Sequence, residues 1–186
     1  MPSQQLAGVE TNEAAARTAE KRTGIRICRT GPGGLPKESR YRRIIFWHAL
    51  EHLHDLHATL SECVARLDKN GIMVIALPNP ESRDARHYRD NWVAWDAPRH
   101  LWHFTRATLG ALLARHGLEI FDLRPYLPDT FYTCLYSEKL AKAEKGRPFT
   151  PVDMGSAFLQ TAIGIGCTFI NRESASTLIY YCRPVA

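Results

Sequence analysis

The stretch IIFWHALEHLHDLHATLSECVARLDKNGIMVIALPNP, residues 44–80, decides the fold of this chain. Residues 44–47 and 72–77 are apolar runs without polar alternation, which is typical of strands covered on both faces in a parallel sheet. Between them, apolar residues recur at helical spacing behind Asp55, which we expect to be the N-cap, and the Asn-Gly pair at 70–71 predicts the C-terminal stop. The pattern therefore predicts a strand–helix–strand crossover in an α/β sheet.

Polar residues gather where these two strands end. His48, Glu51 and His52 follow the first strand, and Pro78 and Asn79 follow the second. In open α/β sheets, ligands bind beyond the carboxyl ends of the strands. Three roles are open for the first group. An imidazole can act as a general base near neutral pH, a carboxylate with imidazoles can hold a divalent metal, and polar residues can cap a helix start.

Two stretches resemble a known family. HALEHLHD, residues 48–55, and RLDKNGIMVIALPNP, residues 66–80, resemble the fourth and fifth strands of class I S-adenosylmethionine-dependent methyltransferases. WDAPRHLWHFT, residues 95–105, is similar to a stretch of the ubiquinone-biosynthesis O-methyltransferase branch, and the resemblance runs from about residue 6 to about residue 123. It implies a Rossmann-like sheet, mostly parallel with an antiparallel last strand, and methyl transfer from S-adenosylmethionine to a small-molecule acceptor.

The resemblance also implies where the cofactor binds. Glu10 ends a short apolar run, residues 6–9, that resembles the second strand of the family. The acidic residue there accepts hydrogen bonds from the ribose hydroxyls, because a carboxylate offers two acceptor oxygens. Trp47 and His48 complete the expected cofactor contacts. A glutamate before a helix can also simply be a favourable charge at the helix N-terminus, so this alternative stays open for Glu10.

Methyl transfer to a hydroxyl needs a group that removes the proton, and histidine suits this near neutral pH. The residues that we assign to catalysis are His48, Glu51, His52 and His100. His100, together with His103, lies in the polar and aromatic segment 80–104, which we expect to be an irregular insertion over the sheet. We assign no set of metal ligands.

The first strand and glycine-rich turn of the family would precede residue 6, and five residues cannot contain them. The GPGG sequence at 31–34 is not followed by a helical pattern, so we interpret it as a flexible loop. We therefore expect a chain truncated at its N-terminus, with S-adenosylmethionine binding that is weak or absent. The missing strand should leave an open sheet edge, which invites a homodimer. The alternative function is a non-catalytic methyltransferase-like module that acts through protein partners.

The length of 186 residues suits a single domain. We divide it into a core (1–124), a variable segment with a short helix (125–172) and a terminal strand (173–186). Residues 154–170, MGSAFLQTAIGIGCTFI, are apolar on most sides. This helix could be buried, bind a partner or lie on a membrane surface, and we expect burial, since it has no basic face.

The net charge of +5 is a modest excess that a solvated basic surface explains, so nucleic acid is not an expected partner. The five cysteines are widely separated and form no C-x-x-C pair, which favours reduced thiols in a cytoplasm. The sequence shows no signal peptide and no apolar run of the roughly 18 residues that a membrane span needs. We expect a cytoplasmic location.

Overall fold

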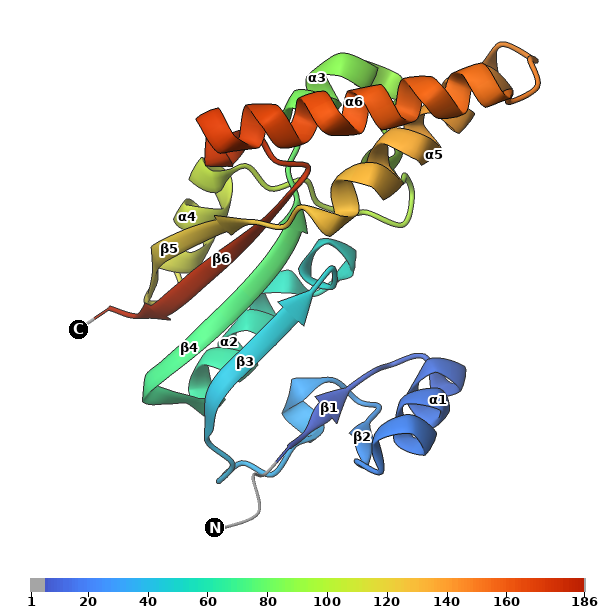
Figure 1. Cartoon of the computed structure of the whole chain (residues 1–186). Coiled ribbons are helices and arrows are strands. Elements are labelled where there is room, and N and C mark those ends of the chain that lie inside the picture. Colours follow the sequence, from blue (N-terminus) through green and yellow to red (C-terminus); the bar gives the residue numbers. More distant parts are fainter. Residues whose placement is uncertain (1–5, 186) are drawn as a thin grey trace.

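A computed structural model describes residues 6–185, which form an α/β fold (Figure 1). One sheet has four strands in the order β3-β4-β6-β5, and a separate sheet pairs β1 with β2. The β1–β2 and β3–β4 pairs are parallel, whereas β6 runs antiparallel to both of its neighbours. The strands are β1 (Gly8–Val9), β2 (Ile27–Cys28), β3 (Tyr41–Trp47), β4 (Leu67–Pro78), β5 (Leu118–Pro125) and β6 (Thr177–Pro184). The predicted α/β class and antiparallel last strand are confirmed.

The helices cover one face of the larger sheet and one of its ends (Figure 1). They are α1 (Glu13–Thr23), α2 (Leu56–Arg66), α3 (Arg83–Tyr88), α4 (Arg106–Ala114), α5 (Pro128–Glu144) and α6 (Pro151–Ile170). Figure 1 shows α2 and α4 behind the sheet, while α3, α5 and α6 lie together beyond the carboxyl ends of β3 and β4. Helix α1 has a side-chain cap at its start and a glycine at its end. Asn12 accepts from the backbone N–H of Ala15, and Gly24 ends α1 at a φ of 70°.

The crossover from β3 through α2 to β4 forms as predicted. The Asp55 carboxylate accepts from the backbone N–H of Ala58 and caps α2. The predicted stop at residues 70–71 is wrong, because α2 already ends at Arg66. Leu67 pairs with Tyr41 across the sheet, so that the chain enters β4 without a loop.

The main core lies between the larger sheet and the helices behind it. Leu60 of α2, Met73 and Ile75 of β4, and Leu109 and Leu113 of α4 are completely buried. Each fully buried aliphatic side chain contributes about 1.5–3 kcal/mol of transfer free energy. This layer therefore stabilises the larger sheet and holds the ends of β3 and β4 in place.

One face of β3 is not covered, which corrects the expectation of burial on both faces. Phe46 is buried, but Ile45 is 60% exposed and Trp47 is 44% exposed. Among the described residues β3 pairs only with β4, and β1 belongs to the separate two-stranded sheet (Figure 1). The run of apolar residues therefore marks an edge strand whose outer side is open.

The structure also corrects the interpretation of the later segments. The insertion 80–104 is not wholly irregular, because Ser82 caps the helix α3. Segment 125–172 contains two long helices, 17 residues in α5 and 20 in α6, where we expected one short helix and one buried helix. In α6 only Asp153, Ala157, Gly164 and Thr168 are buried, because α5 and α3 pack on one side of it. No helix within residues 6–185 is both long and apolar enough to span a bilayer.

Candidate functional site

A hollow of about 350 Å³ lies beyond the carboxyl ends of β3 and β4. Its walls come from these strand ends, the insertion, the start of α5 and the start of β6. The residues that line it are His48, His52, Pro78, Val93, Ala94, Asp96, Arg99, His100, Asp129, Tyr132, Thr133, Ser176 and Thr177. Three of the four predicted catalytic residues thus line one cavity, and the fourth, Glu51, lies against it.

His48 occupies the turn that follows β3 in an unusual backbone conformation. Its φ is 46°, which a residue with a side chain rarely adopts, and its N–H donates to the carbonyl of Ala76 at 3.1 Å. The imidazole lies between two carboxylates. Nε2 is 2.9 Å from Oδ2 of Asp129, and Nδ1 is 3.4 Å from Oε1 of Glu51. Such backbone strain persists where the surroundings fix it and clusters at functional sites.

The two carboxylates control the charge of His48. Burial lowers the pKa of the imidazole, but the contacts with Asp129 and Glu51 outweigh this and raise the pKa to about 9. At neutral pH His48 is therefore an imidazolium. To act as a base, His48 must first lose this proton. The two carboxylates then favour uptake of a new proton by the neutral ring.

Glu51 carries a buried carboxylate that makes no hydrogen bonds within the described residues. It lies in the single turn η2 (Leu50–His52) and is 1% exposed. Neither of its oxygens has a hydrogen-bond partner among the described residues. The backbone carbonyl of Glu51 accepts the N–H groups of Leu101 and Trp102 at 2.9 and 3.2 Å, which ties the turn to the insertion. The groups that can balance its charge are the imidazole of His48, 3.4 Å away, and that of His100, 3.9 Å away, and a bound cation would add to them.

His52 and His100 each hold one ring nitrogen on a backbone carbonyl, and Nε2 of His100 lies 3.9 Å from Oε1 of Glu51. Nδ1 of His52 is 2.9 Å from the carbonyl of Arg99, and Nδ1 of His100 is 2.8 Å from the carbonyl of Ala94. Because a carbonyl only accepts, both Nδ1 atoms carry the proton, and both Nε2 lone pairs are available when the rings are neutral. One ligand atom from each of Glu51, His52 and His100 lies within 4.8 Å of the others. This is a donor set for a divalent metal.

Asp129 is the functional residue that the sequence did not reveal. It stands in the first turn of α5 and accepts from His48 Nε2 and from Thr177 Oγ1, both at 2.9 Å. It is separated from His48 by 81 positions, and only the docking of α5 on the strand ends brings the two together. A Pro-Asp pair at a helix start is so common that it signals no site.

Asn79 has a structural role. Its side-chain NH₂ donates to the carbonyls of Glu173 and Ala175 at 2.7 and 3.0 Å, and its side-chain oxygen accepts from the N–H of Glu81. These bonds hold the turn before β6 against the end of β4. The residue next to it, Pro78, lines the hollow.

The residues expected at the cofactor come from the two separate sheets. Glu10 follows β1, and its Oε1 accepts from the N–H of Asn12 at 2.7 Å. Oε2 has no partner among the described residues, so it can accept from a ribose hydroxyl. Trp47 offers an exposed ring that stands edge-on to Tyr126 at 4.9 Å. These groups fit the cofactor, but residues 6–185 place no strand with a glycine-rich turn between β1 and β3.

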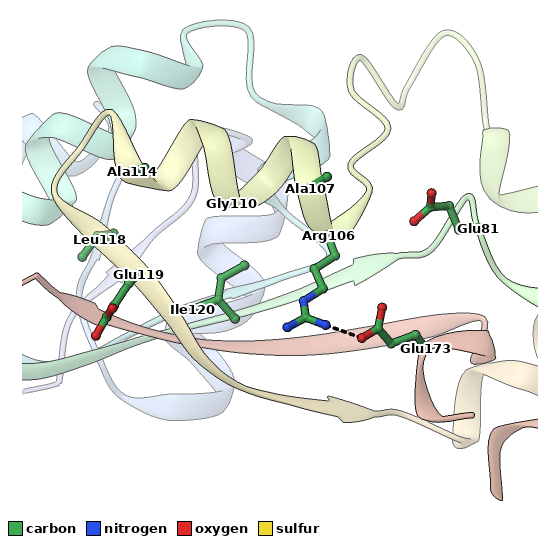
Figure 2. Close-up of a pocket in the computed structure, with 9 residues that line it drawn as sticks. All are labelled: Glu81, Arg106, Ala107, Gly110, Ala114, Leu118, Glu119, Ile120 and Glu173. Carbon is green, nitrogen blue, oxygen red and sulfur yellow. Dashed lines mark hydrogen bonds and ion pairs between the residues drawn. The ribbon is translucent and has the colours of Figure 1, made fainter. Parts of the chain in front are cut away.

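A larger hollow of about 570 Å³ lies between α4 and β5 (Figure 2). Five of its nine lining residues are small or apolar, and the other four are charged: Glu81, Arg106, Glu119 and Glu173. Figure 2 shows the side chain of Arg106 turned toward Glu173, with which it forms an ion pair. Glu119 is likewise paired, with Arg183 at 2.7 Å, and none of the residues predicted for catalysis lines this hollow.

Comparisons with known proteins agree with this architecture. A family model described as a methyltransferase domain matches residues 3–123. A search of the curated proteins found no match. The chain is similar to the structure of a SAM-dependent methyltransferase from Thermotoga maritima, described as a possible histamine N-methyltransferase, with a TM-score of 0.61 and 16% identity over 98% of this chain and 74% of that one.

Two further structures have other reactions in their names. The [4+2]-cyclase SpnF gives a TM-score of 0.58 and 15% identity over 98% of this chain and 67% of that one. The structure of a mycolic acid cyclopropane synthase complexed with SAH and CTAB gives a TM-score of 0.55 and 15% identity over 95% of this chain and 68% of that one. At these identities the likeness establishes the fold alone, since one fold supports many chemistries.

Proposed function

Because the chain belongs to the methyltransferase domain family, we propose that it transfers a methyl group from S-adenosylmethionine to a hydroxyl of a small molecule. The observation that carries the proposal is the cluster of His48, Glu51 and Asp129 beside a hollow at the carboxyl ends of β3 and β4. Among methyltransferases, we favour the ubiquinone-type O-methyltransferase branch. A phenol or catechol fits a hollow walled by Tyr132 and Val93 that also holds charged groups.

In this proposal Glu10 holds the ribose, and Trp47 and His48 border the reacting end of the cofactor. When bound, S-adenosylmethionine supplies an activated methyl group on a sulfonium, so the protein needs mainly to align the acceptor. The neutral fraction of His48 removes the acceptor proton, and Asp129 and Glu51 then stabilise the imidazolium. Since the pKa of His48 is about 9, the rate should rise with pH until about that value.

Transfer of a radiolabelled methyl group to a panel of phenols and catechols tests the reaction. We expect His48→Gln to remove the rise of rate with pH, while the control His54→Gln changes neither rate nor profile, because His54 is exposed and does not line the hollow. If His100→Gln removes the rise instead, His100 is the base. Absence of transfer by a chain that binds S-adenosylhomocysteine would count against the enzymatic proposal.

We further propose that the gap beside β3 takes one more parallel strand from a preceding segment of a longer chain; pairing of this edge with a second copy is the alternative. The support is the open edge of β3, which pairs only with β4 among the described residues, and the exposure of Ile45 and Trp47 on that strand. Without the turn that follows such a strand, cofactor groups lose backbone donors at a cost of about 1–3 kcal/mol each. Two or three such losses reduce affinity by roughly 10² to 10⁵, so the chain alone binds S-adenosylmethionine weakly or not at all.

The rest of the functional assignment follows the sequence. We propose that residues 1–186 act as one methyltransferase-like domain in which segment 125–172 supplies the wall of the acceptor site through Asp129. We place the protein in the cytoplasm, because all five cysteines are free and widely separated.

The donor set at Glu51, His52 and His100 favours a second role for the same site, that of a divalent-metal centre. Both histidines donate Nδ1–H to a backbone carbonyl, which is the support that metal-bound imidazoles usually have. A metal there would compensate the buried Glu51 carboxylate and acidify an acceptor hydroxyl.

Calorimetric titration with Zn²⁺, Mn²⁺ and Mg²⁺, together with metal analysis of the purified protein, tests this role. We expect saturable binding that His100→Gln and Glu51→Gln weaken by about tenfold or more, as loss of a ligand predicts. The exposed His54→Gln variant is the control. Equal binding by the wild type and by both site variants would remove the metal proposal without affecting that of methyl transfer.

A further inference from the structure

The outward face of α6 is entirely apolar. Figure 1 shows this helix as an outer element that crosses α5 and α3. Its exposed residues include no polar or charged side chain. They are Pro151, Val152, Gly155, Phe158, Leu159, Ala162, Ile163, Gly166, Phe169 and Ile170. At 100° per residue these positions fall on one continuous side of the helix, opposite the buried residues of α6.

The face is large enough to form an interface. Its large side chains are 40–91% exposed, with Val152 at 80% and Ile170 at 91%. Together they present on the order of 800 Å² of apolar surface, which equals the share of one partner in a standard interface. The largest apolar patch of a typical monomer covers only about 300–600 Å². Scattered exposed hydrophobic residues need no explanation, but this continuous face does.

Two glycines on this face have no function within the chain. A Cβ added to Gly155 or Gly166 meets nothing within 4 Å, whereas one added to Gly164 approaches Asp84 at 3.1 Å. A glycine inside a helix costs about 1 kcal/mol relative to alanine, so an internal packing reason is expected for each. Gly164 has that reason. For Gly155 and Gly166 the remaining reason is the close approach of a second backbone.

We propose that α6 is a self-association face on which two copies of this chain pack antiparallel, α6 against α6, about a two-fold axis. In the register that opposes residues 155 and 166, Leu159 of one copy faces Ala162 of the other. A large side chain then meets a small one at both symmetric positions. The face is thus self-complementary, as a two-fold interface requires.

The charges favour a second copy over a lipid surface. The one charged residue of α6, Asp153, is buried and pairs with Lys142 of α5 at 2.7 Å. Helices that lie on membranes carry lysine and arginine beside the apolar face to meet anionic lipids. The exposed residues of α6 include none.

Sedimentation equilibrium over a range of concentrations tests the proposal with two matched variants. Leu159→Lys places a cation on the face, and Ile45→Lys places one on the open edge of β3, at nearly equal exposures of 59% and 60%. We expect a wild-type dimer that Leu159→Lys weakens by about 100-fold or more and that Ile45→Lys leaves unchanged. Gly166→Leu should weaken the dimer without loss of the fold, because the added side chain meets no atom of its own chain.

A mixing experiment tests the register. Ala162→Glu alone should also dissociate the dimer, while its mixture with Leu159→Lys should form heterodimers, because residues 159 and 162 face each other across the axis. The proposal is overturned by a monomeric wild type, by a dimer that survives Leu159→Lys, or by one that only Ile45→Lys dissociates. It is also overturned if the wild type stays monomeric and sediments with vesicles of phosphatidylcholine and phosphatidylglycerol, which would assign the face to lipid.

Discussion

Replacement of Asp129 by asparagine should release the proton of His48. The variant keeps the shape of the side chain but removes the charge that lies 2.9 Å from His48 Nε2. Without it, burial still lowers the pKa of the imidazole, and only Glu51, at 3.4 Å, opposes this effect. The pKa of His48 should then fall toward physiological pH, so that a substantial fraction of the imidazole is neutral where the wild-type ring is charged.

The magnitude follows from the pKa of about 9 in the folded chain, against about 6.5 for an ordinary histidine. At about 1.4 kcal/mol per unit this difference amounts to roughly 3 kcal/mol, shared between two carboxylates. Both side chains of the His48–Asp129 pair are 30% exposed, so solvent reduces the share of Asp129. We expect Asp129→Asn to lower the pKa of His48 by about 1–1.5 units and to cost about 1.5–2 kcal/mol of stability at pH 7.

The sign of the pH dependence follows from the raised pKa. The ion pairs of His48 contribute their full stability below about pH 6.5 and lose it as the pH rises through about 9. Urea unfolding between pH 6 and 10 should therefore show a fall in the free energy of unfolding that is smaller in Asp129→Asn. NMR titration of the histidine rings, with His48→Gln to assign the signal, gives the pKa directly. An unchanged pKa of His48 in the two proteins would refute the reasoning.

Four further substitutions test the framework around the site, each by urea unfolding. Asn79→Ala leaves the carbonyls of the turn before β6 without their donors and should cost about 2 kcal/mol; an unchanged midpoint would show that water replaces the amide. Gly164→Val should destabilise the chain, because an added Cβ already lies 3.1 Å from Asp84 Oδ1, while Gly155→Ala should be neutral or stabilising; similar effects of the two would contradict this packing. Burial raises the pKa of Asp84, so Asp84→Asn should raise the urea midpoint at pH 7, and a lower midpoint would mean that the carboxylate is needed in its ionised form.

Local patterns predicted most of the central fold. The helix between β3 and β4 begins after Asp55 as its capping residue indicates, and the last strand is antiparallel as the family resemblance implied. The group His48, Glu51 and His52 had to cluster, because the three residues lie within five positions at one strand end. His100 reaches the same cluster through the insertion.

What the sequence did not predict depends on contacts between distant segments. The outer face of β3 is exposed because burial of a strand depends on what pairs beside it, and an apolar run looks the same in an edge strand. The burial of α6 was overestimated for the same reason, since composition does not say which side is covered. Asp129 joins the site only because α5 packs over the end of β3, and no spacing along the chain encodes this.

The central claim is that these strand ends form the active site of an S-adenosylmethionine-dependent methyltransferase whose cofactor pocket needs one more strand. Calorimetric titration of S-adenosylhomocysteine tests it on two proteins. One is the 186-residue chain, and the other carries a strand, glycine-rich turn and helix grafted before Leu6 from the Thermotoga maritima structure. We predict weak or no binding to the first and micromolar binding to the second, lost in Glu10→Ala. Tight binding by the 186-residue chain would contradict the need for another strand, and no binding by a folded graft would contradict the methyltransferase assignment itself.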